Sequence, residues 1–152
     1  MIRNLPVLLL SILSAFAAGC GGSARLGAPA GFAHVEGRYD DRVASPRGVV
    51  IGARAEKNDP KANLDFWAEA IDLRLRAQGW TPEETKAIKS ARGLAGTSLR
   101  YARVDGARTS RYWASVFVTD ARVVLVEAGG DQRDFDAAKE QVETTIASVV
   151  VD

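Results

Sequence analysis

The run from TSLRYARV (residues 97–104) through RYWASVFVTD (111–120) to ARVVLVEA (121–128) decides the fold class of this chain. All three segments are rich in β-branched and aromatic side chains, which favour strands. The dipeptides DG (105–106) and DA (120–121) stand between them, so the connections are short turns. Strands joined by short turns pair with their sequence neighbours, and the run therefore predicts an antiparallel meander.

A helix is predicted in NDPKANLDFWAEAIDLRLRAQGW (58–80), upstream of the meander. Asn63 can cap its start, and Gly79 marks its end. Five apolar residues recur at helical spacing between these two signals: Leu64, Trp67, Ala68, Ile71 and Leu75. This stripe is expected to pack on the sheet. Trp80, just after the helix, is interpreted as a core anchor rather than a platform for a ligand.

Two further strands are predicted before this helix. GFAHVEGRY (31–39) alternates, with Ala33, Val35 and Tyr39 on one side, which is the pattern of a half-buried strand. DDRVASPRG (40–48) is rich in turn-forming residues and predicts a turn. VVIGARAE (49–56) is predicted to be the second strand.

The segment TPEETKAIKS (81–90) carries two conflicting signals. Thr81, Pro82 and Glu84 form a capping box with proline at the first helical position, which favours a helix. The residues beyond them have too few apolar side chains to support one. We expect one capped turn and then an extended segment, and the pattern leaves open whether residues 81–90 are helix or strand. GLAG (93–96) predicts a turn.

The chain closes with a predicted helix, QRDFDAAKEQVETTIASVVV (132–151). Asp131 is expected to cap it, where the helix dipole favours negative charge. Its apolar stripe consists of Phe135, Ala138, Val142, Ile146 and Val149. The order strand, strand, helix, strands, helix predicts an α+β fold: a mostly antiparallel β-sheet packed by two main helices.

Five segments carry a resemblance to known proteins: GRYDDR (37–42) with GVVIGARAEKND (48–59), LDFWAEAI (64–71) with GW (79–80), GLAG (93–96), LRYAR (99–103), and FVTDARVVLVEAGG (117–130). They resemble small bacterial lipoproteins of uncharacterised function whose domain is similar to the PsbP-like α/β/α sandwich. The resemblance covers most of residues 31–151. Because these are framework positions of strands, turns and helices, it implies a fold and carries over no functional residue.

An export signal is predicted at the N-terminus. Arg3 precedes the apolar run LPVLLLSILSAFAA (5–18), which is shorter than the roughly 20 residues that a membrane-spanning helix needs. AAGC (17–20) resembles the bacterial lipobox, in which small residues precede a cysteine that becomes acylated. We therefore predict that residues 1–19 are a lipoprotein signal peptide, cleaved between Gly19 and Cys20, and that Cys20 is the site of lipid attachment.

An alternative cleavage site, AFA (15–17), suits the ordinary signal peptidase and would leave a soluble protein with a free thiol. Cys20 is the only cysteine of the chain and lies where a lipobox requires it, which favours lipidation. Acyl chains on Cys20 would then attach the protein to a membrane of the bacterial cell envelope. Gly21 is not the aspartate that retains lipoproteins at the inner membrane of many enteric bacteria, so we expect the outer membrane, facing the periplasm.

The rest of the chain divides into a linker and one domain. GGSARLGAPA (21–30) has no periodicity and predicts a flexible tether with a reach of roughly 18 Å. Residues 20–30 are accordingly assigned to the lipidated cysteine and its tether. Residues 31–152 suit a single α+β globular domain.

The sequence contains no recognisable catalytic or cofactor-binding set, and we expect no enzyme activity, cofactor or metal. His34 lies two residues before Glu36, but the later cysteine pair of a zinc deaminase is missing, so it is interpreted as a solvent-facing or hydrogen-bonded strand residue. GLAGTS (93–98) lacks the lysine of a phosphate loop. Acidic and basic residues balance once the leader is removed, which gives no reason to expect nucleic acid as a partner.

Four arginines form the one charge cluster that suggests a contact surface: Arg100, Arg103, Arg108 and Arg111. They lie around a predicted hairpin with only Asp105 to offset them, beside Tyr101, Tyr112 and Trp113. Because arginine matches carboxylate and phosphate groups, the cluster is a candidate surface for an envelope protein or for an anionic glycan or lipid. The alternative is a solvated hairpin edge that charge protects against strand pairing.

Two functions remain open at this point. The first is a lipid-anchored, non-catalytic accessory or binding domain of the envelope, which contacts its partner through the sheet edge or the arginine cluster. The second is a small domain that encloses an apolar ligand between sheet and helix. The aromatic residues that suggest the second function are Phe66, Trp67, Trp80 and Trp113.

Overall fold

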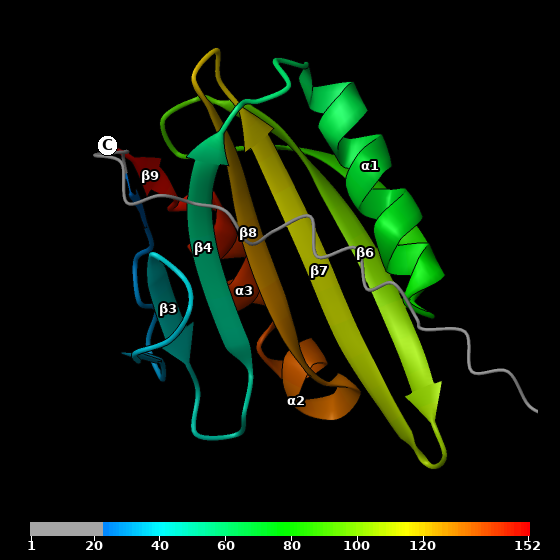
Figure 1. Ribbon diagram of the computed structural model, residues 1–152. Coiled ribbons are helices and arrows are strands. Elements are labelled where there is room, and N and C mark those ends of the chain that lie inside the picture. The colour runs from blue at the N-terminus through cyan, green and yellow to red at the C-terminus, as the bar shows by residue number, and fades with distance from the viewer. Residues whose placement is uncertain (1–22) are drawn as a thin grey trace, which may run out of the picture.

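A seven-stranded sheet forms the centre of the protein (Figure 1). The computed structural model describes residues 23–152. The strands lie in the order β2-β3-β4-β8-β7-β6-β5, and each neighbouring pair is antiparallel. Their bounds are β2 Ala33–His34, β3 Asp41–Ala44, β4 Val50–Lys57, β5 Thr81–Lys89, β6 Ala95–Asp105, β7 Arg108–Val118 and β8 Arg122–Asp131. The prediction of an α+β fold with a mostly antiparallel sheet is confirmed.

Helices cover both faces of this sheet. α1 (Leu64–Ala77) packs on one face, and α2 (Gln132–Ala137) and α3 (Lys139–Ala147) pack on the other. Figure 1 shows α1 beside β6 and β7, and α3 behind β4 and β8. Within residues 23–152, none of the helices combines the length and the apolar character that crossing a membrane requires.

The predicted start, end and apolar stripe of α1 are confirmed. The Asn63 side chain accepts a hydrogen bond from the backbone N–H of Phe66 at 3.0 Å and so caps the first turn. Gly79 ends the helix region with a φ of 89°, a conformation that glycine adopts without strain. Ala68 packs with Val116 of β7, and Leu75 packs against β6 and β7 in a second cluster.

The opposite face holds the largest apolar cluster. Phe135 of α2 and Val142 of α3 are fully buried there, against Trp113 and Phe117 of β7. Asp131 caps α2 as predicted, by accepting from the N–H of Arg133 at 3.1 Å. The single terminal helix predicted over residues 132–151 is wrong. The chain breaks at Ala138, so that α2 covers β7 and β8 while α3 lies over β4, and it ends in a short strand, β9 (Val150–Val151).

The predicted meander is confirmed and is one strand longer than expected. β6, β7 and β8 pair in sequence order, and β5 adds to the outer side of β6. The capped helical turn expected at Thr81 is therefore wrong, while the extended continuation is correct. Pro82 is tolerated because β5 is an edge strand and its register shifts between Pro82 and Glu84, where the missing N–H breaks no central ladder.

The strand predicted over residues 31–39 is mostly absent. Only Ala33–His34 pairs, and Val35 is 40% exposed instead of facing the core. The strand lies further on, in the segment expected to turn, where Val43 is fully buried between β3 and β4. The alternating pattern predicted that Val35 faces the core, whereas Val43 does. Both valines have neighbours that would suit a half-buried strand, so the sequence does not distinguish them.

The segment that follows Cys20 differs from the predicted tether. β1 (Ala24–Arg25) pairs with β9, and both Ala24 and Leu26 are buried in the main core. Carboxylates fix it from the side: Asp40 accepts from the N–H of Ala24 at 3.0 Å, and Asp41 accepts from the N–H of Leu26 at 2.8 Å. The domain thus begins at the first residues that the structure describes rather than at residue 31.

The Asp41 link depends on ionisation. Burial acts to raise the pKa of Asp41, but the hydrogen bonds from the Leu26 N–H and from His34 outweigh it and hold the pKa below its usual value. A carboxylate with a lowered pKa stabilises the fold above its unfolded-state pKa, and this stabilisation is lost as the pH falls through the lowered value. The N-terminal segment is therefore held most firmly at neutral pH.

Replacing Leu26 by alanine tests whether this segment is part of the fold. Leu26 is 7% exposed, so Leu26→Ala should lower the free energy of unfolding by about 3 kcal/mol, measured by urea denaturation. Leu73 on α1 is 61% exposed and is the matched control, with an expected change within about 0.5 kcal/mol. Equal effects of the two substitutions would show that residues 23–30 do not belong to the folded domain.

Candidate functional site

The candidate site lies along the edge of the sheet that β5 forms. Among the described strands β5 pairs with β6 alone, and all of its residues are exposed except Ile88, which is half-buried. The apolar faces of α2 and α3 pack on β4, β7 and β8. β5 and β6 therefore form an open flank on the α3 side of the sheet.

A cleft of about 260 Å³ separates this flank from α3. Its apolar lining comes from Ala87 and Ile88 of β5 and from Ile146 and Ala147 of α3. Its charged lining consists of Lys86, Lys89, Arg100 and Glu143. The volume lies just below the usual range of small-molecule pockets, which is about 300–1,000 Å³.

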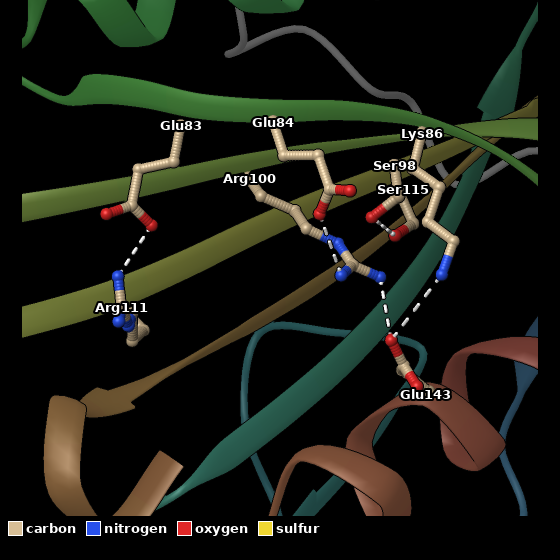
Figure 2. Close-up of polar contacts among 8 residues, drawn as sticks. All are labelled: Glu83, Glu84, Lys86, Ser98, Arg100, Arg111, Ser115 and Glu143. Carbon is tan, nitrogen blue, oxygen red and sulfur yellow. Dashed lines mark hydrogen bonds and ion pairs between the residues drawn. The ribbon is translucent and has the colours of Figure 1, made fainter. Parts of the chain in front are cut away.

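Arg100 is the buried charge of the site (Figure 2). Its side chain is 6% exposed, and its guanidinium contacts Glu84 of β5 at 3.1 Å and Glu143 of α3 at 2.9 Å. The guanidinium carbon lies 3.7 Å from the ring centre of Trp113, a cation–π contact that closes the inner side. The Nε of Arg100 has no hydrogen-bond partner within the described chain.

Arg111 makes a second set of ion pairs beside the first. It contacts Glu83 at 2.6 Å and Asp136 of α2 at 3.1 Å. The hydrogen bond with Asp136 raises the pKa of Arg111, so its charge is permanent. Lys86 completes the network through a 3.9 Å contact with Glu143 (Figure 2). The two arginines thus connect the edge strand β5 to both helices on this face.

The seven-stranded sheet and its helices were compared with known proteins. Solved structures share this arrangement, among them three that each cover at least 88% of this chain. Cyanobacterial PsbP (CyanoP) from Synechocystis sp. PCC 6803 is 14% identical, with a TM-score of 0.58 over 93% of this chain and 99% of that one. LpqN from Mycobacterium tuberculosis, described as involved in cell envelope biogenesis, is 10% identical, with a TM-score of 0.63 over 88% and 86%. The fold is PsbP-like.

A third structure agrees with this result. PA94 from Pseudomonas aeruginosa, a protein of unknown function described as a putative regulator, is 12% identical, with a TM-score of 0.53 over 88% of this chain and 85% of that one. No family model matches the chain, and no curated protein matches it in sequence. At these identities the likeness shows the PsbP-like fold alone.

The four predicted arginines do not form one surface of the PsbP-like domain. Arg100 and Arg111 lie on the α2–α3 face, in the ion pairs described above. Arg103 lies over the ring of Trp80, at 4.4 Å from its centre, and packs on the side of α1. Arg108 is exposed beside the β6–β7 turn. The cluster in the sequence is divided because alternate residues of a strand point to opposite faces.

Other predicted site residues have simpler outcomes. The Nδ1–H of His34 donates to Asp41 at 2.9 Å, and the His34 side chain is mostly exposed, in agreement with the hydrogen-bonded interpretation. Gly19 and Cys20, the predicted cleavage and lipid-attachment residues, lie outside the described part of the chain. The described residues contain no group of three His, Cys, Asp or Glu side chains that could hold a metal ion.

Two phenols, of the buried Tyr101 and the partly buried Tyr112, make the remaining unusual polar contacts. Tyr101 donates to Asp72 at 2.7 Å, and Tyr112 donates to Glu127. Burial is the main reason why the pKa of each phenol lies well above its usual value, and the carboxylate acts in the same direction. Both phenols therefore remain protonated at neutral pH and serve as hydrogen-bond donors that hold neighbouring elements together.

The aromatic residues that suggested an apolar pocket do not meet in one. Phe66 is 49% exposed, and Trp67 donates its indole N–H to Asn58 at 2.9 Å. Trp80 packs on Tyr112 with ring centres 5.0 Å apart, which supports its interpretation as a core anchor. Trp113 lies on the other face under Arg100. The cleft that does exist is lined by aliphatic and charged residues instead.

Sequence reasoning missed Lys86 and the carboxylates that pair with the two arginines: Glu83, Glu84, Asp136 and Glu143. Glu84 and Lys86 belong to a segment with a capping-box pattern, which predicts the start of a helix and not a strand. Once β5 is known to be a strand, Glu84, Lys86 and Ile88 alternate and must share a face. Glu143 carries no such signal, because its pairing with Arg100 joins positions that are far apart in the sequence.

Removing the charge of Arg100 and removing the charges of its two glutamate partners should change the free energy of unfolding by different amounts. Arg100 is buried, whereas Glu84 and Glu143 are about half exposed and can be hydrated when unpaired. The double substitution Glu84→Gln with Glu143→Gln should therefore lower the free energy of unfolding by about 2–4 kcal/mol, because it leaves a buried charge uncompensated. Arg100→Met, which keeps the shape and removes the charge, should change it by less than about 1 kcal/mol.

Denaturant unfolding of both variants measures this difference. Glu36→Gln with Glu69→Gln removes the same two charges from exposed positions and controls for net charge. A larger loss for Arg100→Met than for the double Gln variant would contradict the assignment of Arg100 as the costly buried charge.

Proposed function

We propose that this chain is a lipid-anchored, non-catalytic accessory domain of the bacterial cell envelope that binds a protein partner along β5. The observation that carries the proposal is the exposed edge strand β5, which is nine residues long. Its Glu84 and Glu83 form ion pairs with Arg100 and Arg111, which hold the strand in place. An extended peptide can add to such an edge through backbone hydrogen bonds, while alternate side chains provide specificity.

The likeness in fold supports an accessory role in the envelope. LpqN is described as involved in cell envelope biogenesis, and it has the same PsbP-like arrangement. The lipobox-like AAGC (17–20) suggests the same compartment independently of the fold. We place the protein at the outer membrane, facing the periplasm, because Gly21 follows Cys20.

The edge strand is a better contact surface than the predicted arginine cluster. Arg100 and Arg111 are already neutralised by carboxylates of the same domain, which weakens their attraction for an anionic glycan. Charge reversal at these positions would also disturb packing, so it could not separate binding from folding. β5 offers Thr85 and Ala87 as exposed positions that can be changed with little effect on the core.

A second candidate function is suggested by the cleft between β5 and α3. Its position between sheet and helix agrees with a domain that binds a small, partly apolar ligand. The apolar part of its lining consists of Ala87, Ile88, Ile146 and Ala147. This cleft and the β5 edge lie next to each other, and the two functions are compatible.

The anchor is tested by mass spectrometry of the protein purified from membranes and from the soluble fraction of its host. We expect an N-terminal peptide that begins at Cys20 and carries acyl chains, and a Cys20→Ser variant that is unprocessed or soluble. A soluble product that begins at Ala18 with an unmodified Cys20 would contradict the anchor and favour a freely diffusing binder.

The partner surface is tested with a photo-crosslinking residue at Thr85 on β5, and with the same residue at Leu73 on α1 as control, in intact cells. We expect one discrete adduct from Thr85 and none from Leu73. The adduct is identified and the partner purified, and its affinity for the wild type and for Thr85→Pro is compared. We expect at least about a tenfold loss for Thr85→Pro.

Folding of Thr85→Pro is checked by its unfolding curve, because a proline that broke the β5–β6 ladder would lower stability as well. If so, Thr85→Lys replaces it. Equal crosslinking from Leu73, or unchanged affinity of a folded β5 variant, would exclude β5 as the docking edge.

A further inference from the structure

We propose that the cleft between β5 and α3 binds a small amphipathic anion, a carboxylate with a short aliphatic chain. The inference rests on the second candidate function, since it assigns a ligand class to the same cleft. It does not depend on the protein partner at β5. Size, lining and charge each restrict the ligand.

Size restricts the ligand first. The cleft measures about 260 Å³, which corresponds to about nine water molecules at about 30 Å³ each. A long acyl chain or a sugar–lipid conjugate would extend beyond this volume. A medium-chain molecule such as octanoate is of the right size.

The lining restricts its polarity. Ile88 faces the cleft from β5 and is half-buried, and Ile146 is 5% exposed on α3. Ala87 and Ala147 leave room between the two elements. Ile146 is already almost fully covered, so an aliphatic chain placed here would mainly cover the exposed apolar surface of Ile88 and the two alanines, which is favourable in proportion to the area covered.

Charge restricts the head group. The cleft lining contains three cations, Lys86, Lys89 and Arg100, against one carboxylate, Glu143. Arg100 is held by Glu84 and Glu143 and is not free to bind a ligand strongly. Lys86 makes only a 3.9 Å contact with Glu143, and Lys89 has no ion pair within the described chain. Lys89 therefore offers an unpaired positive charge at the rim and Lys86 a weakly paired one, which fits an anionic head group.

The role of the Arg100 network is to hold the cleft open. Glu143 connects α3 to the sheet through Arg100 (Figure 2). The guanidinium carbon of Arg100 lies 3.7 Å from the ring centre of Trp113, which supports it from the other side. Because the buried guanidinium of Arg100 is costly to leave unpaired, its contact with Glu143 ties α3 to β6 at this point. A preformed cleft spares the ligand the cost of ordering its site.

Three probes of equal length separate charge from apolar contact: octanoate, octylammonium and octanol. Binding to the purified protein is followed by titration calorimetry and by two-dimensional NMR. We expect octanoate to bind most tightly and to shift the resonances of Ile88 and Ile146. Lys86→Gln with Lys89→Gln should weaken octanoate about fivefold, because each exposed lysine contributes a modest charge interaction. Ala147→Trp should fill the cleft and abolish binding.

Lys57→Gln with Lys61→Gln is the matched control, since it removes two positive charges that do not line the cleft. It should leave the octanoate affinity unchanged. Octanol binding as tightly as octanoate, or octylammonium binding better, would overturn the anion assignment while the small-ligand function remains. No binding of any probe, with the cleft resonances unmoved, would overturn both the inference and the second candidate function.

Discussion

Burial of β7 and β8 on both faces is the constraint on which the rest of the domain depends. In β7, Trp113 and Phe117 face α2 and α3, while Ala114 and Val116 face α1. A strand that is apolar on both sides must be covered on both sides. The helices therefore have to lie on opposite faces, and the long connection through α1 carries the chain from β4 across to β5 at the far edge.

The need for cover on both faces is weaker at β6 than at β7 and β8. The candidate site lies beside β6 for this reason. On the α3 face β6 presents Ser98 and Arg100. β7 presents Ser115 there between Trp113 and Phe117, and β8 presents apolar residues. Ser98 is satisfied by a hydroxyl contact with Ser115 at 3.2 Å, and Arg100 by two carboxylates. Polar residues are tolerated at this buried position because each has a partner, and the space beyond them stays open because α3 lies over β4. What would otherwise be continuous core becomes a cleft with a charged wall.

The parts of the PsbP-like fold that the sequence predicts are those with a repeated local signal. The stripe of α1 and the meander of β6 to β8 extend over many residues, so each position supports the next. The errors fall where a signal is short or shared: a capping box in an edge strand, and two valines that suit the same strand equally well. The break at Ala138 has no local signal, since the apolar stripe continues through it.

The site is less predictable than the fold for a related reason. Its arginines could be found as a cluster of like charge, but their grouping in the sequence hides the fact that strand alternation sends them to different faces. Their partners Glu84, Glu143 and Asp136 lie on three other elements. Such pairings are decided by tertiary packing, which a single sequence does not record.

The docked N-terminal segment changes how an anchored domain would sit at a bilayer. If Cys20 carries the lipid, only two residues separate it from Ser23, whose carbonyl accepts from the N–H of Asp152. Three extended residues span about 10 Å at most. The domain would therefore rest against the bilayer surface, and it could not move freely at the end of a long linker. The end that carries β1, β9 and the last turn of α3 would face the lipid, and Ser148 at that end already contacts Gly27. An attached domain of this kind has a fixed underside. β1 packs against β4, and three strands separate β4 from β5, so the β5 edge would lie well away from the bilayer.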